Sequence, residues 1–335
     1  MSIRIGVIGT GWIGEQHVHR LTATVAGAEV AAVSDIDPVR AARIADAAGA
    51  RAADSAEKLI GDPDVEAVVI ASSAAAHAEQ VLACIEAGKQ VFCEKPLTTD
   101  AGDALRVIEA ETALGRRVVQ VGFMRRYDAG YRQMKRVIDA GDVGVPLMAH
   151  CVHRNRSVRE HYTTEMAARD TAVHEVDVLR WLLGEEFVSV QTLVPRKTAR
   201  SRPDLQDPQI FLFETASGVR VDVEAFVNCG YGYDIQCEIV GEEGAVRLPD
   251  PAAPALRRDG RASVPVLPEF GDRFADAFDV ELQEWVDRLR AGEGPAGPSA
   301  WDGYAATIAT DAAVRSLRSG AVVPIDMGER PALYA

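Results

Sequence analysis

Short apolar runs alternate with amphipathic segments along the first third of the chain. The runs are rich in Val and Ile, which is typical of strands in a parallel sheet covered on both faces. They are Ile3–Ile8, Val30–Val33, Val65–Ala71, Gln90–Cys93 and Val118–Phe123. Apolar residues recur at helical spacing in the segments between them, Glu15 to about Thr24, Pro38–Ala48, His77–Ala87 and Asp100–Leu114. Residues 1–123 are therefore predicted to form an α/β domain, a doubly wound parallel sheet with its ligand crevice at the carboxyl ends of the strands.

The pattern changes after Phe123, where longer strand candidates follow one another without intervening helices. These strands are Gln209–Glu214, Val219–Val227 and Tyr233–Val240, and two amphipathic helices follow at Phe274–Leu289 and Trp301–Leu317. Successive strands favour antiparallel pairing. Because 335 residues exceed the roughly 250 to 300 at which single cores stop growing, two domains are expected. Residues 124–335 are predicted to form an α+β domain on a largely antiparallel open sheet, serving substrate binding and oligomerisation.

The first apolar run leads directly into Gly9-Thr-Gly11-Trp-Ile-Gly14. A strand, a tight turn and a helix in this order can bind a dinucleotide pyrophosphate. Gly9 is expected to make the turn, Gly11 to leave room for the phosphates and Gly14 to let helix and strand pack closely. Asp35, 21 residues past Gly14 at the end of the second run, suits the carboxylate that binds the adenosine ribose hydroxyls.

Asp35 also bears on the choice of cofactor. A 2′-phosphate beside this carboxylate would meet a like charge, so NAD is predicted over NADP. Arg40 and Arg43 on the following helix could reach such a phosphate. They are interpreted here as solvated helix residues, with NADP as the minority alternative.

Charge and cysteine content exclude several classes of partner. Fifty acidic against 36 basic residues give a net charge of −14, which disfavours nucleic acid and anionic membranes. The five cysteines are scattered, without a C-x-x-C pair, and are expected to be reduced thiols of a cytoplasmic protein. No signal peptide or membrane span is expected, since the first apolar run is short and broken by Arg4 and glycines.

Two segments carry candidate catalytic groups. Lys95, in Glu94-Lys95-Pro96 after the fourth run, is placed on the rim of the nucleotide crevice; alternatively it is an exposed loop lysine paired with Glu94. Helical spacing puts Asp170, His174 and Asp177 on one stripe, so that Asp170 can orient His174 as a proton acceptor, or form only a surface hydrogen bond with it. No metal site is expected, because His174-Glu175 lacks the second histidine of H-E-x-x-H.

Polar residues in otherwise apolar or aromatic strands form a third group, suited to binding a hydroxyl-rich ligand. They lie in Met124-Arg-Arg-Tyr127, His153-Arg-Asn155 and Tyr231-Gly-Tyr233. Alternatively, these polar residues lie on the surface of loops and edge strands and bind no ligand.

Taken together, Gly9–Gly14, Glu94-Lys95-Pro96 and Asp170-x-x-x-His174 resemble motifs of the Gfo/Idh/MocA oxidoreductases. The resemblance covers essentially the whole chain. Val91–Leu97, Val121–Asp128, His174–Leu182 and Asn228–Gly241 are most similar to the family members that oxidise myo-inositol. One departure is Ser72-Ser73-Ala74, where many members have Thr-Pro.

The resemblance implies a site and a reaction. It implies NAD-dependent oxidation of a ring hydroxyl of myo-inositol to the 2-keto product in a homotetramer, with a Lys95–Pro96 bond that is cis. The implied catalytic residues are Lys95, Asp170 and His174. The implied cofactor-binding residues are Gly9, Gly11, Trp12, Ile13, Gly14, Asp35, Ser72, Ser73, His77, Glu94 and Lys95. The implied substrate-binding residues are Met124, Arg125, His153, Asn155, Asp170, His174, Tyr231 and Tyr233.

Two alternatives stay open at this point. A dehydrogenase for another polyol or aldose, such as scyllo-inositol, chiro-inositol or glucose, would use the same machinery. A non-catalytic NAD-binding sensor would need only the glycine loop, and Lys95, Asp170 and His174 together argue against it.

Overall fold

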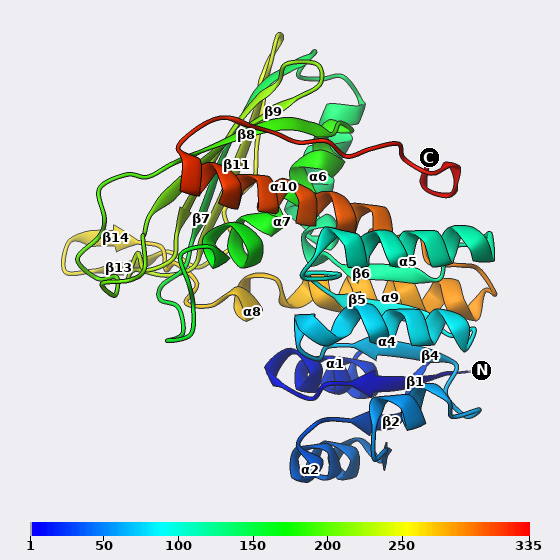
Figure 1. Ribbon diagram of the computed structural model, residues 1–335. Coiled ribbons are helices and arrows are strands. Elements are labelled where there is room, and N and C mark those ends of the chain that lie inside the picture. The colour runs from blue at the N-terminus through cyan, green and yellow to red at the C-terminus, as the bar shows by residue number, and fades with distance from the viewer. Residues whose placement is uncertain (1) are drawn as a thin grey trace. The chain divides into compact units, whose positions relative to one another are not determined.

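A computed structural model describes residues 2–335, which separate into two compact units (Figure 1). Unit 1 comprises the residues up to Met124 together with 278–307 and 328–335. Unit 2 comprises residues 125–277 and 308–327. The first break lies one residue past Phe123, and two later segments that the sequence analysis places in the second domain belong to unit 1.

Unit 1 contains a six-stranded parallel sheet in the order β3-β2-β1-β4-β5-β6. Its strands are β1 (Ile3–Ile8), β2 (Ala28–Ser34), β3 (Arg51–Ala52), β4 (Ala67–Ile70), β5 (Gln90–Glu94) and β6 (Val119–Gly122). The order reverses between β1 and β4, which is where doubly wound sheets bind their ligands. The predicted doubly wound domain is confirmed.

Helices cover this sheet and complete its core. They are α1 (Trp12–Ala23), α2 (Pro38–Ala48), α3 (Ala56–Ile60), α4 (Ala74–Glu86), α5 (Ala101–Leu114) and α9 (Ala275–Arg290), which belongs to unit 1 from Phe278 onward. Asp37 caps α2 by accepting from the Val39 and Arg40 amides, and Gly49 ends that helix at φ +66°. Leu282 and Trp285 of α9 are buried in the same core cluster as β1, β2, α1 and α2. A helix from late in the sequence therefore supplies part of the core of unit 1.

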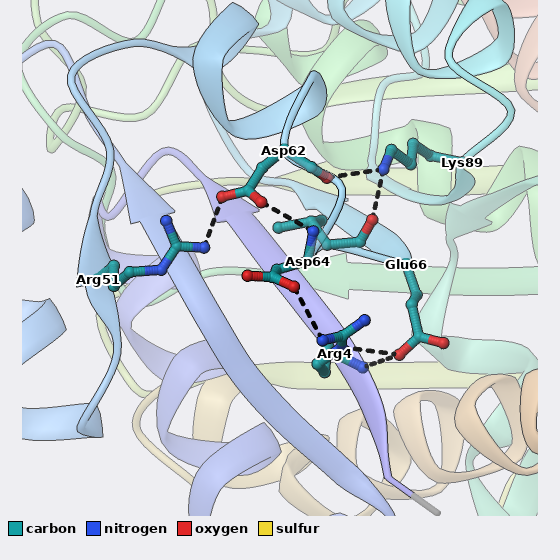
Figure 2. Close-up of polar contacts among 7 residues, drawn as sticks. Arg4, Arg51, Asp62, Asp64, Glu66 and Lys89 are labelled. Atoms are coloured by element: carbon teal, nitrogen blue, oxygen red, sulfur yellow. Dashed lines mark hydrogen bonds and ion pairs between the residues drawn. The ribbon is translucent and has the colours of Figure 1, made fainter.

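Ion pairs tie together the end of the unit 1 sheet where β1 and β4 begin (Figure 2). Arg4 Nη1 lies 3.1 Å from Asp64 Oδ1, and Arg51 Nη2 lies 2.5 Å from Asp62 Oδ2. Lys89 Nζ donates to the carbonyl oxygen of Asp62 at 2.9 Å. These contacts fix the loop before β4 at the amino-terminal end of the strands. The glycine turn lies at the opposite, carboxyl end.

Unit 2 is built on a seven-stranded sheet in the order β12-β11-β7-β10-β9-β8-β15. Its strands are β7 (Pro146–Arg154), β8 (Phe187–Leu193), β9 (Gln209–Thr215), β10 (Arg220–Phe226), β11 (Asp234–Gly241), β12 (Ala245–Arg247) and β15 (Val323–Pro324). The β7–β10 pair is parallel and the other pairs are antiparallel. The predicted, largely antiparallel sheet is confirmed. Two short strands, β13 (Leu256–Arg258) and β14 (Arg261–Ser263), pair separately.

The seven-stranded sheet has a buried face and an outer face. Along β10, Val221, Val223 and Ala225 are buried, whereas Asp222 and Glu224 between them are partly exposed. The helical elements of unit 2 include η1 (Met124–Tyr127), a 3₁₀ turn that starts at the last residue of unit 1, α6 (Ala129–Asp139), the π-helical η2 (Ala167–Ala172), α7 (Val173–Leu183) and α8 (Phe270–Arg273). The two remaining helices are α10 (Ala300–Ser319), whose residues divide between the units at Thr307, and η3 (Ala332–Tyr334) in unit 1. Within residues 2–335, every helix falls short of what a membrane span requires.

Candidate functional site

The turn after β1 has the geometry that a pyrophosphate needs. Gly9 has φ +86°, and a Cβ there would lie 2.5 Å from the Ser72 backbone. A Cβ on Gly14 would lie 1.9 Å from the Gly9 carbonyl oxygen, whereas nothing lies within 4 Å of a Cβ on Gly11. The loop is therefore closed where helix and strand pack and open at Gly11, directly before α1 begins at Trp12. The geometry fits a dinucleotide; Trp12 is exposed and Ile13 half-buried at the same helix end.

Asp35, directly after β2, is held in place by several donors. Its Oδ2 accepts from the Thr10 amide at 2.6 Å and from the Thr10 hydroxyl at 2.9 Å. Arg40 Nη2 lies 2.6 Å from Oδ1. Burial alone would raise the pKa of Asp35, but Arg40 and the hydrogen bonds lower it to about 2, so the carboxylate is ionised at neutral pH.

The two arginines of α2 differ from the expectation that they are simply solvated. Arg40 forms an ion pair with Asp35, and Arg43 Nη1 lies 2.9 Å from Glu15 Oε1. The spacing of five residues between Asp35 and Arg40 spans the turn into α2, so helical periodicity alone did not show this contact.

His77 connects the loops that follow β4 and β5. Its Nδ1 lies 2.8 Å from the Pro96 carbonyl oxygen and its Nε2 lies 3.2 Å from that of Ser72. Burial lowers the pKa of His77 despite these two acceptors. Ser72 donates its hydroxyl to Gln80, and Ser73 precedes α4 as its N-cap residue. Ser72, Ser73 and His77 therefore lie at the strand ends next to the Gly9 turn.

Glu94 links the β5 end to helix α1. Its Oε1 lies 2.6 Å from His17 Nε2, and its Oε2 accepts from the Lys95 amide at 3.2 Å. His17 is fully buried and Glu94 nearly so. The Lys95–Pro96 bond is cis, as the family resemblance implies. In unit 1, Glu94 thus holds the backbone of the residue that carries the candidate catalytic ammonium.

The second set of candidate groups lies in unit 2, around the start of α7. Asp170 belongs to η2 and His174 to the first turn of α7. The predicted stripe therefore crosses a junction between π- and α-helical winding, which recurs at functional sites. His174 is 8% exposed and Asp170 is half-buried. Asp177, the third residue of the stripe, is fully buried and pairs with Arg126, with 2.5 Å between Oδ1 and Nη2.

His153 lies beside His174 in unit 2. It is 3% exposed on the buried face of β7, and its ring centroid lies 6.3 Å from that of His174. Tyr233 packs edge-on against His153 at 5.5 Å between centroids. Arg125 is 1% exposed and forms an ion pair with Glu175, so its guanidinium points into the protein interior.

Asn155 directly follows β7, and Tyr231 lies shortly before β11. The Asn155 amide oxygen Oδ1 is buried and has no hydrogen-bond partner among residues 2–335, which suits a ligand that donates a hydrogen bond. The Tyr231 hydroxyl lies 3.0 Å from Arg154 Nη1 and 2.5 Å from Asp234 Oδ2. Since neighbouring strand residues face opposite sides, Arg154 and Tyr231 lie across the sheet from His153. Met124 is buried at the end of unit 1.

Sequence reasoning did not single out two buried residues, His17 and Glu175. A signal for Glu175 existed, because it lies three residues after Ala172 and four before Leu179, so helical spacing puts it on one side of the helix with these two apolar residues. A charge on such a stripe indicates a buried partner. His17 carries no comparable signal in the sequence.

A parallel sheet of this order, with an open glycine turn and an ionised acid after β2, defines an NAD-binding protein of the Rossmann type. The chain belongs to the Gfo/Idh/MocA oxidoreductases. Residues 3–123 match the description "Oxidoreductase family, NAD-binding Rossmann fold", and residues 135–325 match "Oxidoreductase family, C-terminal alpha/beta domain". The predicted family and the predicted cofactor, NAD, are both confirmed.

Individual relatives match along the full length. The chain is 60% identical to a Saccharopolyspora erythraea protein named inositol 2-dehydrogenase 3, covering 100% of this chain and 98% of the relative. It is 55% identical to a Burkholderia lata inositol 2-dehydrogenase, covering 100% and 99%. The crystal structure of Lactobacillus casei myo-inositol dehydrogenase in complex with NAD(H) and myo-inositol is 39% identical, with a TM-score of 0.98 and full coverage of both chains.

Proposed function

We propose that this protein oxidises myo-inositol to its 2-keto product, with NAD as the acceptor of hydride. The observation that carries the proposal is the full-length similarity, at 60% and 55% identity, to proteins named inositol 2-dehydrogenase. The similarity at TM-score 0.98 to a myo-inositol dehydrogenase supports it. The scyllo-inositol dehydrogenase of Lactobacillus casei, at 24% identity and TM-score 0.87, shares the fold.

In this proposal three residues act on the hydroxyl that is oxidised. His174 accepts the hydroxyl proton, and Asp170 orients the imidazole and favours its protonated form. Lys95 donates a hydrogen bond to the same oxygen, and its charge stabilises the developing alkoxide. Hydride leaves the same carbon for NAD. The Glu94–Lys95 amide contact supports the role of Lys95, since it fixes the backbone that carries the ammonium.

The other ring hydroxyls are assigned to polar groups of unit 2. His153 and Tyr233 lie together on the buried side of the sheet, and Asn155 offers an amide oxygen without a protein partner in the described chain. Arg125 is assigned an indirect role in substrate binding, through the side chains that it contacts, because its guanidinium is buried against Glu175. Met124 supplies apolar packing. Tyr231 stays a prediction from the resemblance.

The experiment incubates purified protein with NAD and a panel of myo-inositol, scyllo-inositol, chiro-inositol and glucose, and follows the absorbance of the reduced cofactor. The expected result is the highest kcat/KM with myo-inositol and a 2-keto product by NMR. A higher kcat/KM with another member of the panel would show that this compound, and not myo-inositol, is the preferred substrate. Binding of NAD without turnover of any of them would identify a sensor.

A variant pair tests the assigned base. His174→Ala is expected to lower kcat by about 10² to 10⁴, the usual effect of removing a positioned base, with unchanged affinity for NADH. His161→Ala removes an exposed histidine of the same unit and serves as the matched control, with activity like the parent. Full activity of His174→Ala would refute the assignment.

We also propose that the chain forms a cytoplasmic homotetramer through the outer face of the unit 2 sheet. That face has apolar side chains at Met148 (40% exposed) and Leu212 (37%), next to the ion pair of His150 with Asp222. Apolar area on an open sheet favours cover by a second copy.

A further inference from the structure

Three ionisable side chains contact one another in the interior of unit 2. Arg125, Glu175 and His153 are between 1% and 3% exposed. Glu175 Oε1 accepts from Arg125 Nη1, and Glu175 Oε2 lies 3.0 Å from His153 Nδ1. Arg125 Nη2 lies 3.1 Å from the same imidazole nitrogen. His153 Nδ1 therefore faces both a carboxylate and a guanidinium, and only one of them can be its partner at a time.

The partner of His153 Nδ1 is the Glu175 carboxylate. Arg125 has two other acceptors, Glu175 Oε1 and the Tyr233 side chain. The Nδ1–H of His153 is the donor that the structure offers to Glu175 Oε2. A buried carboxylate oxygen facing a nitrogen lone pair would lose a charge-assisted hydrogen bond, which is stronger than a bond between neutral groups. The proton therefore belongs on Nδ1.

The charges of Arg125 and Glu175 determine which charge His153 can carry. Burial by itself raises the pKa of Glu175, but the Arg125 charge and His153 lower it to about 2, so Glu175 is anionic at neutral pH. Arg125 and Glu175 cancel each other. A second proton on His153 would place an unbalanced positive charge beside the buried guanidinium, which is disfavoured. With the Nδ1 proton donated to Glu175, Nε2 is the acceptor of the neutral ring.

We infer that Glu175, buttressed by Arg125, is a positioning residue that fixes His153 as the Nδ1–H tautomer, so that Nε2 accepts a hydrogen bond from a substrate hydroxyl. This inference rests on the proposed function, in which His153 lies at the substrate beside His174. It adds a substrate rule: the group opposite His153 must be a free hydroxyl. A carbonyl or an O-methyl ether there would oppose two acceptors.

A neighbouring ion pair provides a matched control. Arg126 and Asp177 come from the same two elements, η1 and α7, and Asp177 is as buried as Glu175. Asp177 follows Glu175 by two residues, about 200° around the helix, so it points to a different side. Removing either pair disturbs the packing of η1 on α7, whereas the contacts with His153 Nδ1 come from the Arg125–Glu175 pair.

The experiment compares three double variants of the full chain. Arg125→Met/Glu175→Leu removes both charges of the pair, because a lone buried charge would itself destabilise the fold. Arg125→Met/Glu175→Gln restores a neutral acceptor for Nδ1–H. Arg126→Met/Asp177→Leu is the control. The readouts are the ¹⁵N shifts of the His153 ring, identified by their loss in His153→Gln, with kcat, KM for myo-inositol, Kd for NADH and Tm.

The expected parent spectrum shows Nδ1 protonated and Nε2 as an acceptor. In Arg125→Met/Glu175→Leu the tautomer becomes mixed or reversed, and KM rises about 3- to 10-fold, the loss of one hydrogen bond. The Kd for NADH stays the same. The Gln variant recovers the tautomer and most of the KM, and the control keeps the Nδ1–H tautomer of the parent.

Two results would overturn the inference: an Nε2–H tautomer in the parent protein, or the same loss of the Nδ1–H tautomer in the control. Failure of the proposed function is a separate outcome. A parent protein with the Nδ1–H tautomer that oxidises no polyol would refute the proposed function, whereas the tautomer would still show that Glu175 positions His153.

Discussion

His17 of α1 and Glu94 of β5 form a buried contact, with 2.6 Å between Nε2 and Oε1. The glycine turn leads into α1, and Glu94 in turn accepts from the Lys95 amide. One side-chain pair therefore joins the helix next to the cofactor loop to the segment that bears the candidate catalytic lysine.

Replacing His17 tests this connection. His17→Leu leaves the buried Glu94 carboxylate without its imidazole donor, so we expect the free energy of unfolding to fall by about 1 to 3 kcal/mol, measured with urea. Turnover is expected to fall as well, since Glu94 no longer fixes Lys95. His19→Leu, on the exposed side of the same helix, is the control. Parent-like stability and turnover in His17→Leu would show that the contact has no such role.

Asp35 and Arg40 together are expected to set the preference for NAD. In the parent protein kcat/KM is expected to be higher with NAD than with NADP, because a 2′-phosphate meets the Asp35 carboxylate. Asp35→Ser removes that repulsion and releases Arg40, so activity with NADP is expected to rise about 10-fold or more.

The double variant Asp35→Ser/Arg40→Ala separates the two causes. If Arg40 binds the 2′-phosphate once Asp35 is gone, most of the gain with NADP is lost in the double variant. Steady-state kinetics with both cofactors measure each change. Equal kcat/KM with NAD and NADP in the parent protein would contradict the role of Asp35.

The pH profile is expected to report on His174 and Asp170. Activity should fall on the acidic side as the imidazole, whose unperturbed pKa is about 6.5, becomes protonated and can no longer accept a proton. Asp170→Asn removes a charge that favours imidazolium, so the acidic limb is expected to move to lower pH. A limb that stays in place would mean that another group controls it.

Acid stability is expected to depend on Glu175. Its pKa in the folded protein, about 2, lies below its ordinary value of 4.5. The ionised form is thus favoured by folding, and this stabilisation is complete above pH 4.5 and lost as the pH falls toward 2. One such group contributes a slope of up to about 1.4 kcal/mol per pH unit.

The variant Arg125→Met/Glu175→Leu is expected to lack that part of the slope, whereas Arg126→Met/Asp177→Leu keeps it. Urea unfolding at several pH values between 2 and 5 measures both. Identical slopes in the parent and the Glu175 variant would contradict the lowered pKa.

Assembly is expected to depend on the outer face of the unit 2 sheet. Leu212→Glu places a charge on β9 at this face, so a tetramer at micromolar concentration is expected to dissociate into smaller species by light scattering. Leu256→Glu, at an exposed position on β13, is the control. A parent protein that scatters as a single chain would refute the tetramer itself.

Features that depend on neighbours in sequence could be predicted. The boundaries of α2 match the predicted Pro38–Ala48, because Asp37 and Gly49 give local start and stop signals. The continuous Val/Ile runs located the five longer strands of unit 1, since strands buried on both faces need such runs. The strand at His153 was predicted without bounds, because His150, His153 and Arg154 interrupt the apolar pattern of β7.

The contacts of the site that were not predicted join residues far apart in the sequence. Arg125 and Glu175 are 50 residues apart, and His17 and Glu94 are 77 residues apart. Glu94 and Arg125 were predicted as site residues, but only the fold shows that they are buried and which residue each pairs with. The π-helical winding at Asp170 was likewise not predicted from the sequence.

The division of unit 1 into separate stretches has a consequence for its biosynthesis. Trp285 and Leu282 fill the core beneath β1 and β2, and the Tyr334 hydroxyl donates to the buried Glu111 at 2.7 Å. A ribosome that has released only the first 124 residues has exposed a sheet whose core is incomplete. The core of unit 1 is therefore completed only when residues 278–307 and 328–335 are available, so chaperones have a longer time in which to bind its exposed apolar surface.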